Sequence, residues 1–388
     1  MNRRHFLQTA AVATGVSLVS GMPQVLGQAA PSPYRKLLIL IELKGANDGL
    51  NTVVPFTNSR YAELRPRLAL TRDKLLQVSD REALHPSLEP LMPIWQNKEM
   101  AIVQGLGYPS PNLSHFRSIE IWETASKSDE YLESGWLARA FASSPAPRDF
   151  AADGVVVGSN EMGPLSGAGA RVIALANTEQ FLRNARLAQP NANSRNAALK
   201  HLLSVEQEII HAAAKLNTNF AFKTEFPRNA FGNQIRTAAQ LAANKAGVAA
   251  IRVTLGGFDT HAGQLGTHAN LLKELAEGIA ALKSALGEIN RWNETLVMTY
   301  AEFGRRPKEN QSGGTDHGTA SAHFVMGGRV QGGLYGEPPA LDKLDGNGNL
   351  PFAVDFRSQY ATVLDKWWGL DASRVLGGRY SPLEFLKV

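Results

Sequence analysis

The chain has 388 residues, of which 44% are hydrophobic, and this is enough to bury the core of one large α/β domain or two smaller ones. The formal net charge is only +5 and no run of five or more Lys and Arg occurs, which argues against a nucleic-acid-binding protein. The absence of Cys excludes disulfide bonds, thiolate metal sites and Cys nucleophiles.

The N-terminal segment has the pattern of a twin-arginine export signal, although a disordered basic start is an alternative. Arg3-Arg4 precedes a weakly apolar stretch, Thr9–Val19, and the small residues at 27–29 suit a signal peptidase. The apolar stretch is too short for a spanning helix, and no other segment reaches about eighteen apolar residues. We therefore predict a signal peptide over residues 1–29, export by the twin-arginine translocase to the periplasm or beyond, and no stable membrane span after cleavage.

Short apolar runs followed by glycine or turn residues predict buried strands, and longer stretches with apolar residues three and four apart predict helices. The predicted strands, in chain order, are 36–43, 101–106, 154–158, 172–175, 249–255 and 295–300. The predicted helices are 88–96, a helix that begins after His115, 196–217, and one from near Thr267 to Leu286.

Strands that alternate with helices favour parallel crossover connections. The fold class predicted from this order is α/β, a three-layer α/β/α sandwich with a mostly parallel sheet. Residues 30–388 are expected to form a single domain. The less regular region of about 130–220 is predicted to be a cap inserted over the strand ends.

Acidic and histidine side chains follow two of the predicted strands. Asp259 and His261 come after the strand at 249–255, and Glu302 comes after the strand at 295–300. Side chains at the carboxyl ends of neighbouring parallel strands meet in one crevice, and carboxylate and imidazole groups are ligands of divalent metals. We predict all three as metal ligands. The alternative for Asp259 and His261 is a helix cap followed by a surface histidine.

Two further predicted ligands lie in glycine-rich turns. Asp48 follows the first strand beside Gly49, and His317 lies between Gly314 and Gly318. The alternatives are a turn made for geometry alone and a hydrogen-bonded loop histidine. His268 and His323 are further candidates, which we expect to be structural or exposed.

Ser114 is the predicted nucleophile because it precedes a predicted helix, whose N-terminus favours a nucleophile and a bound anion. The alternative is that Ser114 only caps this helix. Arg305 and Arg117 are predicted to hold the oxygens of a phosphate or sulfate group, although Arg305 could instead pair with Glu302. No Gly-x-Ser-x-Gly elbow, Walker loop or Gly-x-Gly-x-x-Gly follows the first strand, which disfavours an α/β-hydrolase and nucleotide cofactors.

Together with the leader, five segments resemble the family of exported bacterial proteins grouped as domain of unknown function 1501. These segments are Glu42–Thr52, Gly107–Ser118, Gly257–His261, Tyr300–Arg306 and Gly314–Gly318. The family resembles, more distantly, the alkaline phosphatase, sulfatase and phosphoglycerate mutase superfamily. The resemblance implies an α/β sandwich that usually binds two divalent metals.

The superfamily's functional residues can be matched to this sequence in chain order. The resemblance implies that Asp48 is the first acidic ligand, that Ser114 is the nucleophile, and that Asp259 and His261 form the next metal-binding pair. Glu302 then takes the place of an Asp, and His317 is the final His.

The match departs from the superfamily at two points. Asp259 and His261 are only two residues apart, and Phe303 stands where the superfamily has a metal-binding His. A two-metal site built on this pattern would therefore be incomplete.

The sequence predicts an exported metal-dependent hydrolase of phosphate or sulfate esters, or a related transferase, with one or two divalent ions (Zn, Mn or Ca). The substrate would be a small anionic ester. The alternative is a non-catalytic periplasmic binding or assembly protein that retains the fold, which Phe303 favours. A weaker third hypothesis is a sugar-acting hydrolase with Asp259 and Glu302 as its two carboxylates.

Overall fold

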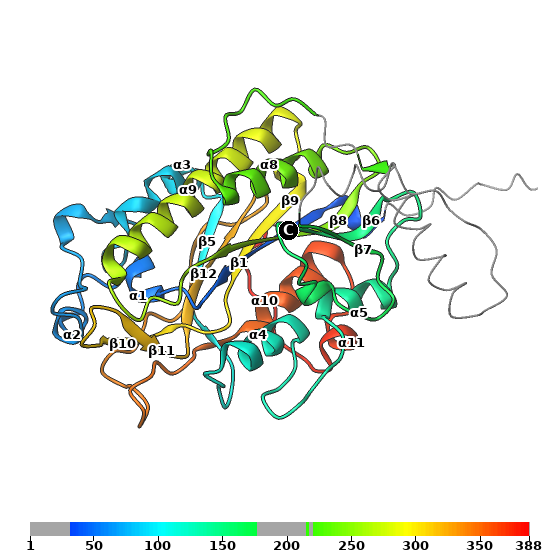
Figure 1. Cartoon of the computed structure of the whole chain (residues 1–388). Coiled ribbons are helices and arrows are strands. Elements are labelled where there is room, and N and C mark those ends of the chain that lie inside the picture. The colour runs from blue at the N-terminus through cyan, green and yellow to red at the C-terminus, as the bar shows by residue number, and fades with distance from the viewer. Residues whose placement is uncertain (1–31, 177–214, 217–219, 388) are drawn as a thin grey trace, which may run out of the picture. The chain divides into compact units, whose positions relative to one another are not determined.

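A nine-stranded sheet forms the centre of the computed structural model (Figure 1), which describes residues 32–176, 215–216 and 220–387. The strand order is β13-β5-β12-β9-β1-β8-β6-β7, and β14 pairs with β5. The strands are β1 (Leu37–Lys44), β5 (Met100–Gly107), β6 (Ala152–Val157), β7 (Val172–Leu175), β8 (Val248–Gly256), β9 (Thr295–Tyr300), β12 (Ser321–Met326), β13 (Gly333–Gly336) and β14 (Val354–Asp355).

The sheet is mostly parallel, as predicted. The central strand β1 pairs in parallel with β8 on one side and with β9 on the other. β12 alone among these strands runs antiparallel to its neighbours, β5 and β9. The carboxyl ends of β8, β1 and β9 therefore lie side by side at one edge.

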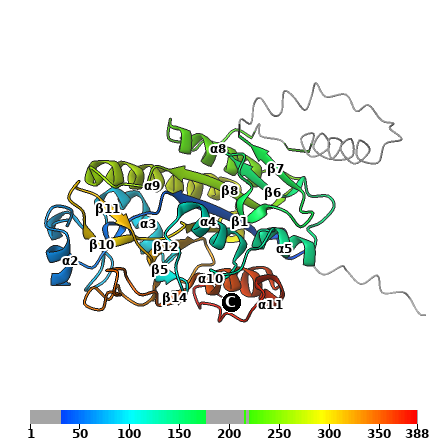
Figure 2. The ribbon, with the colours of Figure 1, turned by 60° about the horizontal axis from the view of Figure 1, so that its bottom comes forward.

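Helices cover both faces of the sheet, so the three-layer α/β/α architecture is confirmed (Figures 1 and 2). Alternate residues of β1 face opposite layers: Ile39 and Ile41 join one core cluster, and Leu38 and Leu40 join the other. The first layer consists of η3 (Pro86–Leu91), α3 (Met92–Gln96), α8 (Ala230–Ala242) and α9 (Gln264–Glu288). The second consists of α4 (His115–Thr124), α5 (Trp136–Ser143), α10 (Phe356–Ala361), η6 (Thr362–Trp368) and α11 (Ala372–Leu376).

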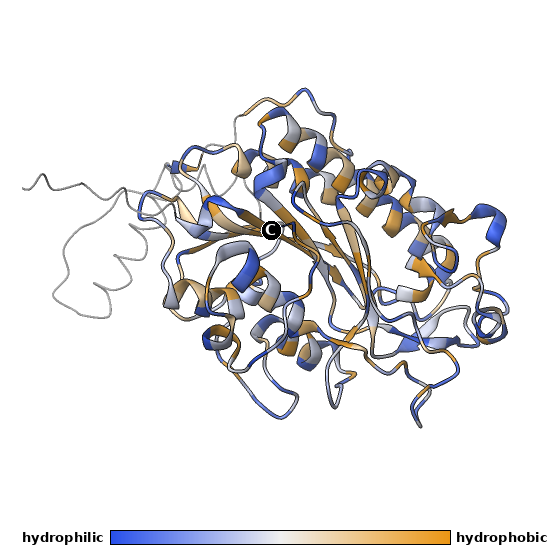
Figure 3. Cartoon of the chain, turned by 180° about the vertical axis from the view of Figure 1, so that it is seen from behind, coloured by the Kyte–Doolittle hydropathy of each residue, from blue (hydrophilic) through white to orange (hydrophobic). Residues whose placement is uncertain are grey.

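Hydrophobic residues concentrate on the strands and on the helix faces that pack against them (Figure 3). The long helix α9 illustrates this pattern, because its apolar stripe, which includes Leu272, Leu275, Ile279 and Leu282, is fully buried. No helix in the described part of the chain combines the length and hydrophobicity needed to cross a membrane.

Shorter elements gather at the end of the sheet where α9 begins (Figure 1). They include an antiparallel hairpin and a small three-stranded sheet of order β2-β4-β3. Their bounds are α1 (Gly49–Thr52), β2 (Val53–Val54), α2 (Ser59–Leu64), β3 (Leu76–Gln77), β4 (Ala83–Leu84), β10 (Arg305–Glu309) and β11 (Thr315–His317). Single 3-10 turns cover η1 (Pro33–Arg35), η2 (Arg72–Lys74), η4 (Gly163–Leu165) and η5 (Trp292–Glu294).

The region predicted as a cap lies partly in the sandwich itself. Its described part, residues 130–176, contributes α5 to one helical layer and places β6 and β7 in the main sheet. This part is therefore not a cap; residues 177–214 lie outside the described residues, as do most of the predicted helix 196–217 and the leader 1–29. The described residues from Ser32 onward belong to one compact unit.

Candidate metal centre

The turns after β8 and β9 pack against the turn after β1. Asp259 and His261 follow β8, and Glu302 follows β9. Gly45, just beyond β1, donates its backbone N–H to Glu302 Oε1 over 3.0 Å. A Cβ atom on Gly45 would lie 2.5 Å from the backbone nitrogen of Asp259, and the φ of Gly45 is +109°, so this close approach requires glycine.

The β10–β11 hairpin brings His317 to the same place. Arg305 on β10 pairs with His317 on β11. The hairpin packs closely on the β8 turn, because a Cβ on Gly314 would lie 2.3 Å from the backbone carbon of His261. The predicted ligands Asp259, His261 and His317 are thus brought together.

A further histidine, His115, joins these three side chains from the first position of α4. His115, Asp259 and His317 each offer one donor atom, and these atoms lie within 4.8 Å of one another. The Nε2 atom of His317 lies 3.0 Å from the Nε2 atoms of both His115 and His261, and 3.3 Å from Asp259 Oδ1. We call His115, Asp259, His261 and His317 the candidate metal centre.

The Nδ1 atoms of His317 and His115 form hydrogen bonds to oxygen acceptors. His317 Nδ1 lies 2.8 Å from the backbone oxygen of Leu113, and His115 Nδ1 lies 2.7 Å from Glu302 Oε1. Because a carbonyl and a carboxylate only accept, both Nδ1 atoms carry the ring proton, and in neutral imidazoles both Nε2 atoms then present lone pairs. Two lone pairs that face each other at 3.0 Å repel unless a cation or a shared proton lies between them.

The donor set fits a divalent metal. Donors bound tetrahedrally at about 2.0–2.1 Å from one ion lie about 3.3 Å apart, close to the separations seen here. Imidazole and carboxylate are ligands of zinc and of similar transition metals, and metal-binding histidines usually donate their other N–H to a carboxylate or a carbonyl. In the same way, His261 Nδ1 faces Asp316 Oδ1 at 3.5 Å.

Glu302 contacts the candidate metal centre through a hydrogen bond to His115. Its Oε1 accepts from both His115 and Gly45, which fixes the orientation of the His115 ring. Its Oε2 is buried and has no hydrogen-bond partner in the described part of the chain. A buried carboxylate oxygen without a donor is costly unless a cation lies nearby, so this orphaned atom also suits a metal.

Phe303, which stands where the resemblance would place a histidine, is buried against the imidazoles. Its ring centroid lies 4.9 Å from that of His115 and 4.8 Å from that of His317. It packs the two rings in place and offers no donor atom.

The two arginines predicted to hold an anion have other partners. Arg305 is buried; its Nη1 donates to Asp259 Oδ1 over 2.7 Å, and its other nitrogens donate to Thr315. Arg117 donates to the backbone oxygens of Lys127, Ser128 and Glu130 and lies over the ring of Tyr131. Arg305 therefore positions Asp259, and Arg117 holds the 127–131 loop.

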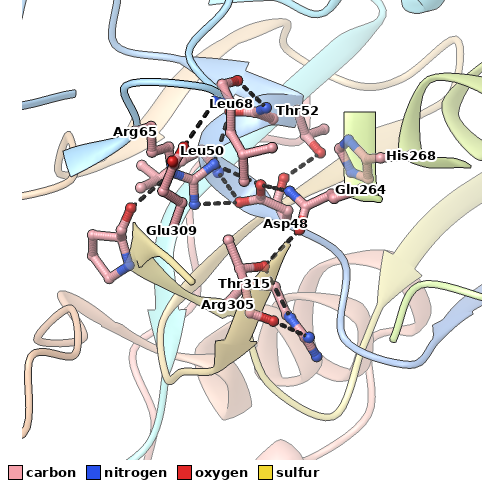
Figure 4. A network of polar contacts seen from close by, with 12 residues as sticks. Asp48, Leu50, Thr52, Arg65, Leu68, Gln264, His268, Arg305, Glu309 and Thr315 are labelled. Carbon is pink, nitrogen blue, oxygen red and sulfur yellow. Dashed lines mark hydrogen bonds and ion pairs between the residues drawn. The ribbon is translucent and has the colours of Figure 1, made fainter. Parts of the chain in front are cut away.

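Asp48 also has other partners and does not join the candidate metal centre. Its two carboxylate oxygens accept from Arg65 over 2.6 and 2.9 Å, and one of them also accepts from Gln264 (Figure 4). Gln264 Oε1 in turn accepts from Thr315, which contacts Arg305. A buried chain of polar contacts thus links the Asp48–Arg65 ion pair to Asp259.

Ser114 occupies the N-cap position of α4, next to His115, and its hydroxyl makes no capping hydrogen bond. The side chain is exposed, and its hydroxyl has no hydrogen-bond partner among the residues that the structure describes. The other two histidine candidates are buried: His268 contacts Asn47 Oδ1, and His323 packs against Trp122.

Comparisons with known proteins place the chain in a family. The family described as "Protein of unknown function (DUF1501)" matches residues 35–378. The chain belongs to this family. The predicted membership is confirmed over residues 35–378, and it does not by itself assign an activity.

Solved structures with a similar arrangement include the protein Ps i-CgsB in complex with k-i-k-neocarrahexaose, at 11% identity and a TM-score of 0.44, over 89% of this chain and 75% of that one. A phosphonate monoester hydrolase from Silicibacter pomeroyi matches at 10% identity and a TM-score of 0.42, over 89% and 76%. The alkaline phosphatase from the Antarctic bacterium TAB5 matches at 12% identity and a TM-score of 0.34, over 78% and 94%. No curated protein matches this chain.

Burial and neighbouring groups shift the pKa values of side chains in the candidate metal centre. Burial raises the pKa of the Asp259 carboxyl, but the hydrogen bond and charge of Arg305 outweigh it and hold this pKa below its usual value. Burial lowers the pKa of the His317 imidazole, whereas the hydrogen bond to Glu302 raises the pKa of His115. These shifts favour the anionic form of Asp259 and the neutral form of His317, which are the forms that bind a metal, whereas His115 would have to release its Nε2 proton to a bound ion.

Replacing Glu302 with glutamine should weaken metal binding about 10- to 100-fold, as is typical when the partner of a metal-binding histidine is changed. The amide oxygen can still accept from His115, but the negative charge is lost. Competition with a chelator of known affinity measures the effect. The surface variant Glu161→Gln, which only frees Lys44, is the matched control and should bind metal as the wild type does. Equal affinities in the two variants would contradict the supporting role of Glu302.

Proposed function

We propose that this protein is an exported, metal-dependent hydrolase of phosphate or sulfate esters, or a related transferase. The observation that supports the proposal most directly is the convergence of the Nε2 atoms of His115, His261 and His317 on the carboxylate of Asp259, at 3.4, 3.0 and 3.3 Å. The twin-arginine pattern in the sequence of residues 1–29 supports export. One or two divalent ions would be held by these four residues, with Glu302 behind them.

A divalent ion bound there would neutralise negative charge on the ester group and lower the pKa of a nearby hydroxyl. Ser114 is the nucleophile in this proposal, because it lies next to His115 at the start of α4 and its hydroxyl makes no capping hydrogen bond. Its Oγ would form a bond to phosphorus or sulfur, its proton would pass to solvent, and the bond to the alcohol would break. Water would then hydrolyse the seryl ester, or an acceptor alcohol would take the group in a transferase.

Replacing Ser114 with alanine should abolish turnover and leave the metal content unchanged, because no donor atom is removed. The assay uses the purified, metal-loaded protein with aryl phosphates and aryl sulfates. Ser128→Ala is the matched control, since the Ser128 hydroxyl only contacts the backbone of Pro109. Undiminished activity of Ser114→Ala would remove Ser114 from the mechanism.

The non-catalytic binding or assembly role is the second candidate. The contacts of both arginines favour it, because Arg305 already binds Asp259 and Thr315, and Arg117 already contacts loop carbonyls and Glu120. Stoichiometric metal without turnover of any phosphate or sulfate ester would support this role over the hydrolase.

A further inference from the structure

A buried glutamine, Gln264, connects two of the chain segments that carry donors of the candidate metal centre. It is the first residue of α9, and its side chain lies between Asp48 and Thr315 (Figure 4). Its Oε1 atom accepts from the hydroxyl of Thr315 over 2.7 Å and from the hydroxyl of Thr260 over 3.0 Å. Gln264 and both threonines are buried, so these hydrogen bonds are shielded from water.

Each of the two threonines is close in sequence to donor residues. Thr260 lies between Asp259 and His261 in the turn after β8. Thr315 begins β11, two residues before His317. The single acceptor atom of the glutamine therefore joins the β8 turn to the β10–β11 hairpin at the place where their donors meet.

The orientation of the Gln264 amide is fixed by the Asp48–Arg65 ion pair. Its Nε2 atom donates to Asp48 Oδ2, and Arg65 holds the same carboxylate oxygen. Because a carboxylate only accepts, the amide nitrogen must face Asp48 and the amide oxygen must face the two threonine hydroxyls. An asparagine at position 48 would still offer an acceptor oxygen, so this orientation needs an acceptor there and not a charge.

We propose that Gln264 is a positioning residue, which holds Asp259 and His261 at the distance from His317 that a bound ion requires. This inference rests on the proposed function, because it concerns the metal centre on which that function depends. Asp259 Oδ1 and His261 Nε2 lie 3.3 and 3.0 Å from His317 Nε2. Donors that are already held at this spacing lose less conformational entropy when the ion binds, so the ion is bound more tightly.

Gln264→Met tests the proposal, because methionine has a similar length but cannot replace the hydrogen bonds to the threonines. It should weaken Zn²⁺ binding about 10-fold, the lower end of the range seen when the partner of a metal ligand is changed. Competition with a chelator of known affinity measures the Kd. Gln359→Met is the matched control, since Gln359 is also buried and its amide has no hydrogen-bond partner in the described part of the chain. An unchanged Kd in folded Gln264→Met would overturn the proposal.

Thr260→Val is a second, milder test of the same contact. Valine removes only the hydroxyl, and the backbone N–H of Thr315 still donates to the carbonyl of residue 260 over 3.2 Å, so the variant should fold. It should weaken Zn²⁺ binding in the wild type but have no further effect in Gln264→Met, where the partner is already absent. Thr52→Val is the matched control, because the Thr52 hydroxyl is also buried but contacts Asn47 and a backbone carbonyl of the β1 turn. Independent, additive effects of Thr260→Val and Gln264→Met would overturn the proposal.

The visible absorption of bound Co²⁺ gives a readout that a loss of stability alone would not change. The d–d bands of Co²⁺ depend on the number and arrangement of its ligands. Gln264→Met and Thr260→Val should shift these bands, whereas the controls Gln359→Met and Thr52→Val should not. Identical spectra in the wild type and all four variants would mean that Gln264 does not position the donors, and would overturn the proposal.

Turnover of aryl phosphates and aryl sulfates, measured in parallel, separates this inference from the proposed function. Turnover by the wild type, with the same Zn²⁺ affinity in Gln264→Met, would overturn the positioning role alone. Weaker Zn²⁺ binding by Gln264→Met in a protein without turnover would overturn the hydrolase and leave the positioning role. A wild type that binds neither Zn²⁺ nor Co²⁺ would overturn both.

Discussion

Replacing His317 with alanine should remove the bound divalent ion, measured as metal per chain by elemental analysis. The Nε2 atom of His317 lies within 3.3 Å of donor atoms on His115, His261 and Asp259, so it is central to the donor set. Loss of a direct donor should cost more than the 10- to 100-fold expected for Glu302→Gln, that is, at least about 100-fold in affinity. The wild type should retain one or two ions through the same purification.

Chelation of the wild type is the matched comparison for His317→Ala. Because a ligand that binds only the folded state stabilises it, removal of the metal should lower the thermal unfolding midpoint of the wild type towards that of the variant. Chelator should then have little further effect on the variant itself. Full metal occupancy in folded His317→Ala would show that the ion is held by other residues.

The sequence predicted the strands that position the site because each is a short apolar run followed by glycine or a turn. β1, β8 and β9 were predicted to within one residue at each end, and their parallel pairing explains why Asp259 and Glu302 lie at one edge. The antiparallel strand β12 was not predicted. Its apolar residues extend only from Ala322 to Met326 around His323, and its direction depends on the hairpin that precedes it.

His115 was not predicted as a donor because its sequence context indicates only the start of a helix. It lies more than 140 residues from Asp259 in the chain, and only the packing of α4 against the strand ends brings the two together. The sequence analysis instead predicted a functional role, that of the nucleophile, for the neighbouring residue Ser114. The segment Asn112–His115 still contained a usable signal, since a histidine at a helix start after a strand and a proline-rich loop is placed at the same edge as the other donors.

The partners of charged residues could not be read from the sequence. Asp48 has the local pattern of a ligand in a glycine-rich turn, but its carboxylate pairs with Arg65, 17 residues along the chain. Arg305 follows Glu302 closely in sequence, yet its guanidinium contacts Asp259. Which carboxylate an arginine reaches depends on tertiary packing, so spacing along the chain does not determine it.

Replacing Asp48 with asparagine should destabilise the fold by about 3–5 kcal/mol, the usual cost of breaking a buried ion pair. Both Asp48 and Arg65 are fully buried, and the new amide N–H would face the guanidinium of Arg65 as donor against donor. Urea unfolding at neutral pH measures the loss. Glu63→Gln is the matched control, because Glu63 pairs with Arg60 on the surface and such pairs contribute at most about 1 kcal/mol.

The metal content of Asp48→Asn distinguishes the two roles considered for this residue. If Asp48 acts only through its ion pair, the folded variant should bind as much metal as the wild type. Loss of metal with little loss of stability would instead make Asp48 a ligand, as the superfamily resemblance implies.

The destabilisation by Asp48→Asn should also depend on pH. Burial raises the pKa of the Asp48 carboxyl, but the charge and hydrogen bonds of Arg65 outweigh it, so the pKa in the folded protein is below its usual value. A carboxyl of this kind contributes its full stability above its unfolded pKa of about 3.9 and loses it as the pH falls through the folded pKa. The difference in unfolding free energy between wild type and Asp48→Asn should therefore be largest at neutral pH and shrink below about pH 4. A difference that stays constant from pH 7 to pH 3 would mean that the charge of Asp48 does not stabilise the fold.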